Sequence, residues 1–523
     1  MKINTRSMLY GTMILSTANL IVRLLGFAYR VFLSRMIGPQ GMGLVQLVFP
    51  VFQIAITLIA AGIPAAVSRL ISEKNARQDI LGMRRTMTAA ITMAVILSTT
   101  LALLALLNLD FITRVIIKDQ RTKGALFILF PNLIFIGLGA ALKGFFYGRK
   151  EIHPPALAEM IEQFLRMSVT IGLIHWLVPK DNYTLAAVLV MLGTVFGEIS
   201  SLLFLHTRYH KAKKHLRPQN TGFMRKRTRI RDISQAAGAI AAIAMPITAT
   251  RLISSIMLAA NSILIPQRLM AGGMMRDQAL GLFGIVSGMV MPLLFLPFTI
   301  TNALTVVIIP NLSESRAMNR WKDIQSKINK AIRLTCYIAF ASTALLVSLG
   351  RPAADLLYQQ PLAAVFLIPL SYSLLFHALQ HTCSGILNGL GKQNRAALHF
   401  IAGSSIQLLC TWFLLANPLI RIWGMIIGFT LSSMIVSTAN LTLVLKTAGM
   451  SFRILDWILK PGFAALFMGL FTGLLYQLLT AARTPALLNL PVSAAAGLLL
   501  FLLLLWAANG TPALEAWKSR FKG

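Results

Sequence analysis

The feature that most constrains this chain is a series of apolar stretches, each about 20 residues long, separated by short polar breaks. A helix of this length crosses the bilayer core and satisfies all of its backbone hydrogen bonds internally. We count about fourteen such stretches. Charged residues make up only 12% of the sequence, about half of their share in soluble domains. The sequence therefore predicts an all-α, polytopic membrane protein.

The basic residues predict how the chain is oriented. They outnumber acidic residues 49 to 16, and most of them fall in every second loop. Cytoplasmic loops carry such an excess, so we predict a multi-pass plasma-membrane protein with both termini in the cytoplasm. Orientation also accounts for the net charge of +33. We predict no nucleic-acid partner, because no nucleic-acid-binding motif accompanies the charge.

Short motifs recur with a spacing of 241 residues, which corresponds to six predicted helices. The recurring pairs are Ser72-Glu73 with Ser313-Glu314, Gly144 and Gly148 with Gly385 and Gly389, and Gly43 with Gly284. An even number of helices preserves the orientation, so we predict two parallel six-helix lobes with a transport site between them. The predicted parts are an N-terminal lobe (1–207), a basic cytoplasmic linker (208–232), a C-terminal lobe (233–445) and two further helices with a cytoplasmic tail (446–523).

No catalytic or cofactor motif accompanies these helices. The sequence has no phosphate-binding P-loop, HExxH motif or nucleophile elbow in a plausible context. The three cysteines lie in apolar stretches without the spacing of metal ligands or of a disulfide framework. We therefore predict a transporter rather than an enzyme, with no catalytic residue, cofactor or metal site.

Arginines inside the predicted spans are the most informative polar residues. An arginine near the bilayer centre costs at least about 2.5–3.5 kcal/mol on insertion scales and usually has a function. Arg23 and Arg30 lie seven positions apart on one face of the first predicted helix, and Arg251 and Arg268 lie on the helix that repeats it. Because guanidinium groups bind phosphate oxygens bidentately, we predict that these four residues line an anion-binding cavity. Snorkelling of individual arginines toward the interface stays open.

Acidic residues inside the spans are few. Glu159, Glu162 and Arg166 lie on the fifth predicted helix, and Glu198 lies on the sixth. Glu162 and Arg166 are four positions apart, which favours a local ion pair, and Glu198 is a second candidate partner for Arg166. Two interpretations of this group stay open: structural pairing, or coupling of transport to a proton or cation.

Several stretches resemble the stage V sporulation protein B family of the multidrug/oligosaccharidyl-lipid/polysaccharide (MOP) exporter superfamily. They are Arg23-Leu-Leu-Gly-Phe-Ala-Tyr-Arg30, Gly62-Ile-Pro64-Ala-Ala-Val-Ser68, Pro292-Leu-Leu-Phe-Leu-Pro297 and Ile309-Pro-Asn-Leu-Ser-Glu314. The resemblance implies the fold of multidrug exporters of the MATE type and of the lipid II flippase MurJ. Arg23 matches the first arginine of a similar motif in lipid II flippases, whereas Tyr29 stands at the second and Arg30 follows it. Those flippases carry a charged pair in helix 2, where this chain has Gln53.

The resemblance also implies a function. It is that of a flippase that moves a polyprenyl-diphosphate-linked saccharide by alternating access, with lipid II for cell wall and spore cortex as the closest implied substrate. The implied partners are this lipid-linked oligosaccharide, membrane lipids, and peptidoglycan-synthesis or sporulation envelope proteins. The implied membranes include the outer forespore membrane. Three alternatives stay open: another lipid-linked polysaccharide repeat unit, a small-molecule exporter on the same scaffold, or a non-transporting scaffold protein.

Overall fold

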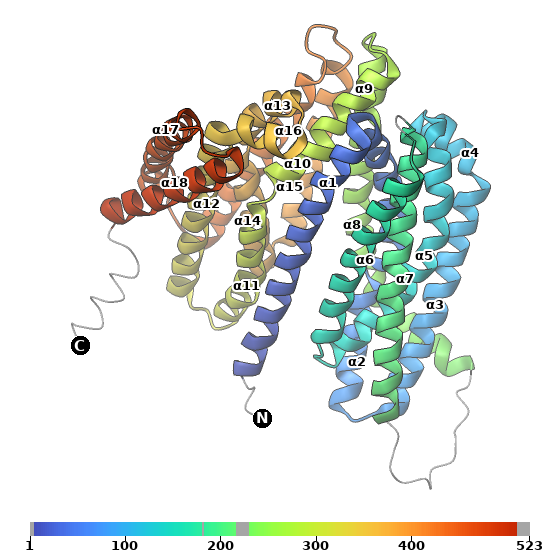
Figure 1. Ribbon diagram of the computed structural model, residues 1–523. Helices are drawn as coiled ribbons and strands as arrows, with labels where there is room; N and C mark the ends of the chain where they lie inside the picture. Colours follow the sequence, from blue (N-terminus) through green and yellow to red (C-terminus); the bar gives the residue numbers. More distant parts are fainter. Residues whose placement is uncertain (1–4, 180–181, 216–229, 510–523) are drawn as a thin grey trace. The chain divides into compact units, whose positions relative to one another are not determined.

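A computed structural model describes residues 5–179, 182–215 and 230–509, and all regular elements in these ranges are helices (Figure 1). Eleven of them are long and apolar enough to cross a membrane, or twelve if one bent pair forms a single span. The predicted all-α, polytopic class is thereby confirmed. The number is lower than about fourteen, in part because one long helix combines two predicted spans. Most of the predicted linker and the C-terminal tail lie outside the described residues.

The described chain forms two compact units, the first comprising residues up to Gln267 with Met275–Gly284, and the second Arg268–Met274 with the residues from Ile285 onward. The helices, joined in places by short π- or 3₁₀-helical turns, are α1 (Thr5–Ala60), α2 (Ile63–Ala76), α3 (Ile80–Leu107), α4 (Leu109–Phe111), α5 (Lys123–Gly148), α6 (His153–Leu177), α7 (Tyr183–His215), α8 (Ile230–Ala271), α9 (Arg276–Phe283), α10 (Met291–Leu294), α11 (Phe298–Ala317), α12 (Trp321–Tyr358), α13 (Pro361–Ser371), α14 (Leu374–Gly389), α15 (Gln393–Leu414), α16 (Trp423–Ala448), α17 (Lys460–Ala481) and α18 (Ala486–Asn509).

Two breaks shape the start of the first unit. Helix α1 is interrupted at Gly38, whose φ of 65° and ψ of −176° are accessible essentially to glycine alone. The interruption divides α1 into two arms. A second break at Gly62 separates α1 from α2, and Pro64 occupies the first turn of α2, where its missing N–H costs nothing. A Cβ on Gly62 would overlap the backbone of Ala244, so the second break lies directly against α8.

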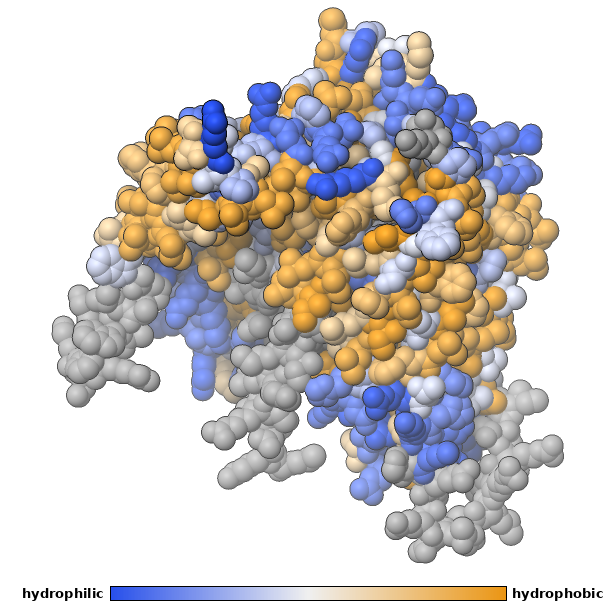
Figure 2. All heavy atoms as spheres, in the orientation of Figure 1, coloured by the Kyte–Doolittle hydropathy of each residue, from blue (hydrophilic) through white to orange (hydrophobic). Residues whose placement is uncertain are grey.

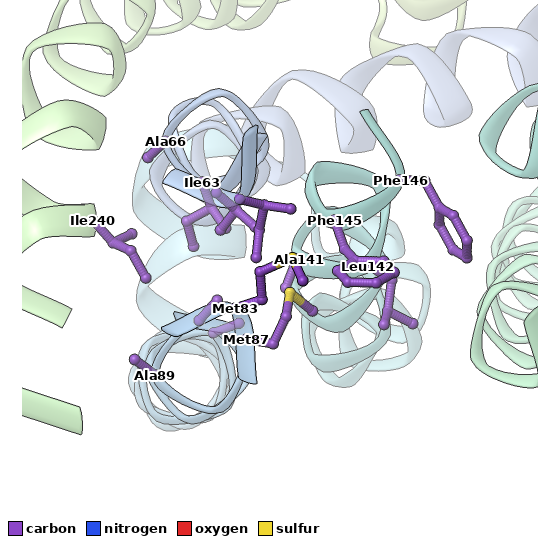
Figure 3. Close-up of a cluster of buried hydrophobic side chains, with 14 of the residues drawn as sticks. Ile63, Ala66, Met83, Met87, Ala89, Ala141, Leu142, Phe145, Phe146 and Ile240 are labelled. Atoms are coloured by element: carbon purple, nitrogen blue, oxygen red, sulfur yellow. The ribbon is translucent and has the colours of Figure 1, made fainter. Parts of the chain in front are cut away.

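The core next to this break joins six helices of the first unit, α2, α3, α5, α6, α7 and α8. Figure 3 shows Met83 and Met87 of α3 between Ile63 of α2 and the α5 side chains around Ala141. Ile240 of α8 belongs to the same cluster. Packing therefore places most of α8 in the first unit, whereas the repeat assigns its sequence to a C-terminal lobe. The lobe boundary at 208–232 stays a prediction.

The repeated glycines have equivalent surroundings in the two units. In the first unit, a Cβ on Gly148 of α5 would collide with Ile71 of α2. In the second, a Cβ on Gly389 of α14 would press on Leu312 of α11. Ile71 and Leu312 are themselves 241 residues apart. Since glycine at a crossing lets two helices approach closely, the repeat preserves one helix contact in each unit.

The surface has the pattern expected of a chain in lipid. Figure 2 shows hydrophobic residues over the middle of the first unit's helices and hydrophilic ones at the end that carries α2. Large apolar side chains such as Leu103, Phe127 and Phe164 are exposed, each by more than half. In water such a surface would drive association, whereas acyl chains cover it at no cost.

We predict that Gly148→Ala destabilises the protein. The added methyl group must displace Ile71 and the Ser68 carbonyl, and overpacking of this kind costs about 1–3 kcal/mol. Gly172→Ala in α6 is the matched control, because no atom lies within 4 Å of its new methyl group. Thermal unfolding in detergent should show a lower midpoint for Gly148→Ala and an unchanged or higher one for Gly172→Ala. Equal midpoints would contradict the close contact of α2 and α5.

Candidate functional site

A cavity of about 590 Å³ lies within the first unit. Both arms of α1 contribute to its wall, together with α6, α7 and α8. Its lining residues are Gly26, Tyr29, Arg30, Leu33, Met42, Val45, Gln46, Phe49, Pro50, Gln53, Gln163, Arg166, Val190, Thr194, Ser255, Leu258, Ala259 and Ser262. The volume lies in the usual range for pockets that bind small molecules or cofactors.

The charge of this wall is entirely positive. Arg30 and Arg166 line the cavity, and no carboxylate does. Tyr29 stands where the resembling motif has its second arginine, and Arg30 follows it. Both residues line the cavity. Three glutamine amides and several hydroxyl groups complete the polar part of the wall. A wall of this composition suits an anion that also carries hydroxyl groups.

Two buried polar atoms of the lining lack a hydrogen-bond partner among the described residues: the Tyr29 hydroxyl and Arg166 Nε. Tyr29 lies beside the Thr170 hydroxyl, but the two do not reach hydrogen-bond geometry. Buried donors of this kind are nearly always satisfied in proteins. Both atoms are covered by neighbouring side chains, so each lies within the wall rather than at the surface of the cavity.

A cluster of half-buried charged side chains includes Arg166. Glu162 forms an ion pair with Arg166, and Lys143 of α5 lies 3.4 Å from Glu159. Glu198 of α7 interacts electrostatically with Glu162, Lys143 and Arg166. The structure thus brings together the four residues that the sequence grouped.

Glycines of α7 make this arrangement possible. A Cβ on Gly193 would overlap Thr170, and one on Gly197 would press on the Glu162 carbonyl and Arg166. Lys143 was not among the residues predicted from the sequence, although a lysine inside a predicted span is itself a signal.

The remaining predicted cavity residues have different surroundings. Arg23 and Arg251 are exposed and do not line this cavity. Arg268 belongs to the second unit, where its guanidinium stacks 4.2 Å from the centre of the Trp412 ring and donates from Nε to the Trp412 carbonyl at 2.8 Å. That these three face a transport pathway stays a prediction.

Sequence comparisons match the chain to known transporters. Residues 8–316 match the family described as "Polysaccharide biosynthesis protein", and residues 246–413 match the MatE family. The chain is 26% identical to stage V sporulation protein B of Bacillus subtilis, with 87% of each chain covered. It is 21% identical to the lipid II flippase MurJ of the same organism, with 86% of this chain and 84% of that protein covered.

Structural comparison gives the same fold. The lipid II flippase MurJ in an inward closed conformation superposes with a TM-score of 0.69, covering 95% of this chain and 98% of that one. An inward-facing multidrug resistance MATE family transporter gives 0.65, covering 83% and 98%. Both are 16% identical to this chain, so they show a shared fold.

We predict that the Glu162–Arg166 pair stabilises the protein more than an exposed pair of the same spacing. The two side chains are only 15% and 23% exposed, against 53% and 68% for Glu73 and Arg69. Glu162→Ala should therefore cost about 3 kcal/mol, and Glu73→Ala less than about 1 kcal/mol. Unfolding midpoints in detergent measure the difference.

A double-mutant cycle isolates the pair itself. If the ion pair carries the effect, Glu162→Ala/Arg166→Ala should be more stable than the sum of the two single changes implies. Additive effects would instead assign the loss to packing.

Proposed function

Because the chain belongs to the polysaccharide biosynthesis protein family of MOP-superfamily transporters, we propose that it is a flippase for a polyprenyl-diphosphate-linked saccharide. Membership in this family places the chain among membrane transporters rather than enzymes.

One observation carries the proposal: the cavity wall holds Arg30 and Arg166 and no carboxylate. A diphosphate carries its charge on oxygens that match the planar fork of a guanidinium. The amides of Gln46, Gln53 and Gln163 add donors and acceptors suited to sugar hydroxyl groups. Both halves of a saccharide-diphosphate headgroup therefore find complementary groups in one wall.

Binding of a diphosphate would also affect the ion pair of Arg166. Its charge is shared between Glu162 and the cavity, so an entering diphosphate competes with Glu162 for the same guanidinium. The headgroup would cross while its polyprenyl tail stays in lipid, where moving it costs little. Arg23, Arg251 and Arg268 are proposed to contact the headgroup elsewhere on its path. The Glu159, Glu162 and Glu198 group is proposed to pair the buried cations, or to couple transport to an ion.

Lipid II is the proposed substrate, with an action in the plasma membrane or the outer forespore membrane. The names of two relatives, a stage V sporulation protein and a lipid II flippase, support this choice. Both termini are proposed to lie in the cytoplasm, following the distribution of basic residues. Peptidoglycan-synthesis or sporulation envelope proteins are the proposed protein partners.

A small-molecule exporter is the second candidate, favoured by the match of residues 246–413 to the MatE family. An exporter of organic cations would need acidic groups in its cavity, whereas no carboxylate lines this one, and the nearby Glu159 and Glu162 pair with Lys143 and Arg166. Efflux of cationic dyes by the purified protein, unaffected by Arg30→Ala, would favour this candidate.

We predict that Arg30→Ala and Arg166→Ala each reduce flipping of a fluorescent lipid-linked saccharide diphosphate in proteoliposomes. Loss of one charge-assisted contact should lower the rate about ten- to a hundredfold. Arg30→Lys should retain part of the activity, because it keeps the charge but loses the bidentate geometry. Arg69→Ala, which removes an exposed arginine of α2 outside the cavity, is the control and should match the wild type.

Complementation of a strain depleted of its lipid II flippase then identifies the saccharide. Rescue by the wild type but not by Arg30→Ala is the expected result. Rescue by both would rule out the cavity as the binding site. A wild type that flips other lipid-linked saccharides in vitro but never rescues the strain would exclude lipid II and retain the flippase. Arg23→Ala, Arg251→Ala and Arg268→Ala in the same assay test the remaining predicted residues.

A further inference from the structure

The second unit has a polar pocket of about 400 Å³ that the transport proposal does not use. One side is a face of α12, which carries Lys322, Gln325, Ser326 and Asn329 on successive turns. The other side is the loop after α16, with Gly449, Met450, Ser451 and Arg453. Every side chain in the lining except that of Met450 is polar or absent.

The pocket is held in shape by bonds at both ends of the loop. Gln325 Nε2 donates to the Ala448 carbonyl at 2.8 Å, where Gly449 ends α16 with a φ of 63°. Beyond the pocket, the fully buried Trp457 donates from Nε1 to Asn329 Oδ1 at 2.8 Å. Because the Asn329 oxygen is engaged, its amide N–H groups are what remain for a ligand.

The two cations of the pocket have no ion-pair partner in the part of the chain that the structure describes. The acid nearest in sequence to Lys322 is Asp323, which pairs with Lys327 at 2.8 Å. The Asp456 carboxylate is hydrogen-bonded to Lys460 at 2.9 Å. It interacts with Arg453 only electrostatically, without an ion pair. A preformed, polar pocket with two unneutralised cations is suited to an anion.

The position of the pocket indicates what kind of anion. Three candidate membrane spans of the second unit have an end here: Trp321–Tyr358 and Leu455–Ala481 begin at it, and Trp423–Ala448 ends at it. Because the ends of membrane spans lie near the bilayer interface, we expect lipid headgroups next to the pocket. Next to Arg453, the side chains of Phe452, Ile454 and Leu455 are about half exposed, at 47%, 53% and 58%. Apolar surface beside a cationic pocket at this depth matches a lipid, with its phosphate in the pocket and its acyl chains on the loop.

We propose that this pocket binds the phosphate headgroup of an anionic phospholipid. The loop that carries Arg453 also connects α16 to α17, so a bound lipid would tie the last two helices to α12. The site is independent of the transported substrate, since none of its residues belongs to the cavity of the first unit.

The test measures stabilisation of the detergent-solubilised full chain by added lipid. Phosphatidylglycerol should raise the unfolding temperature of the wild type, whereas phosphatidylcholine, a zwitterion, should not. In Lys322→Gln/Arg453→Gln the apparent affinity for phosphatidylglycerol should fall about thirtyfold, because two cations at the headgroup are lost. Lys330→Gln/Lys446→Gln removes the same charge from exposed positions of α12 and α16 outside the pocket and should keep the affinity.

Three further results decide the matter. Lys322→Arg/Arg453→Lys keeps both charges and should restore binding even if the glutamine variant is unstable. Equal loss in both glutamine variants would overturn the site in favour of non-specific attraction. Stabilisation of the wild type by inorganic phosphate at the level reached with phosphatidylglycerol would overturn the lipid and assign the pocket to a soluble phosphate.

Discussion

A charge on a half-buried side chain is stabilised by a partner of opposite charge, and Arg166 has this partner in Glu162 on its own helix. Helix α7 packs closely against α6 beside this pair, because a Cβ on Gly193 would overlap Thr170 and one on Gly197 would press on the Glu162 carbonyl. That approach also brings Glu198 to the pair. The close contact of these two helices therefore places a second carboxylate beside the arginine that lines the cavity.

The sequence predicted the helical class and the grouping of Glu159, Glu162, Arg166 and Glu198. It did so because apolar length and the spacing of residues along a helix are local properties. Sequence alone could not give the rotation of each helix against its neighbours. For that reason the sequence predicted Arg166 only as a pairing residue, although it lines the cavity. It likewise placed Arg23 and Arg251 in the cavity, whereas both are exposed outside it.

The repeat illustrates the same difference at a larger scale. Gly148 with Ile71 and Gly389 with Leu312 form matching contacts in the two units, as a duplicated helix arrangement requires. Yet most of α8 packs with the first unit, since Gly62 admits it directly against α2. A duplicated sequence therefore predicts which contacts recur, but a helix that follows the linker can still pack with the preceding bundle.

The break at Gly38 has a consequence for the cavity. Tyr29 and Arg30 lie on the arm of α1 before it, and Gln46 and Gln53 lie on the arm after it. Two portions of the wall thus belong to the two arms of one helix, which are joined at Gly38. A rotation about the two backbone dihedral angles of Gly38 would therefore change the separation between the guanidinium and the amides.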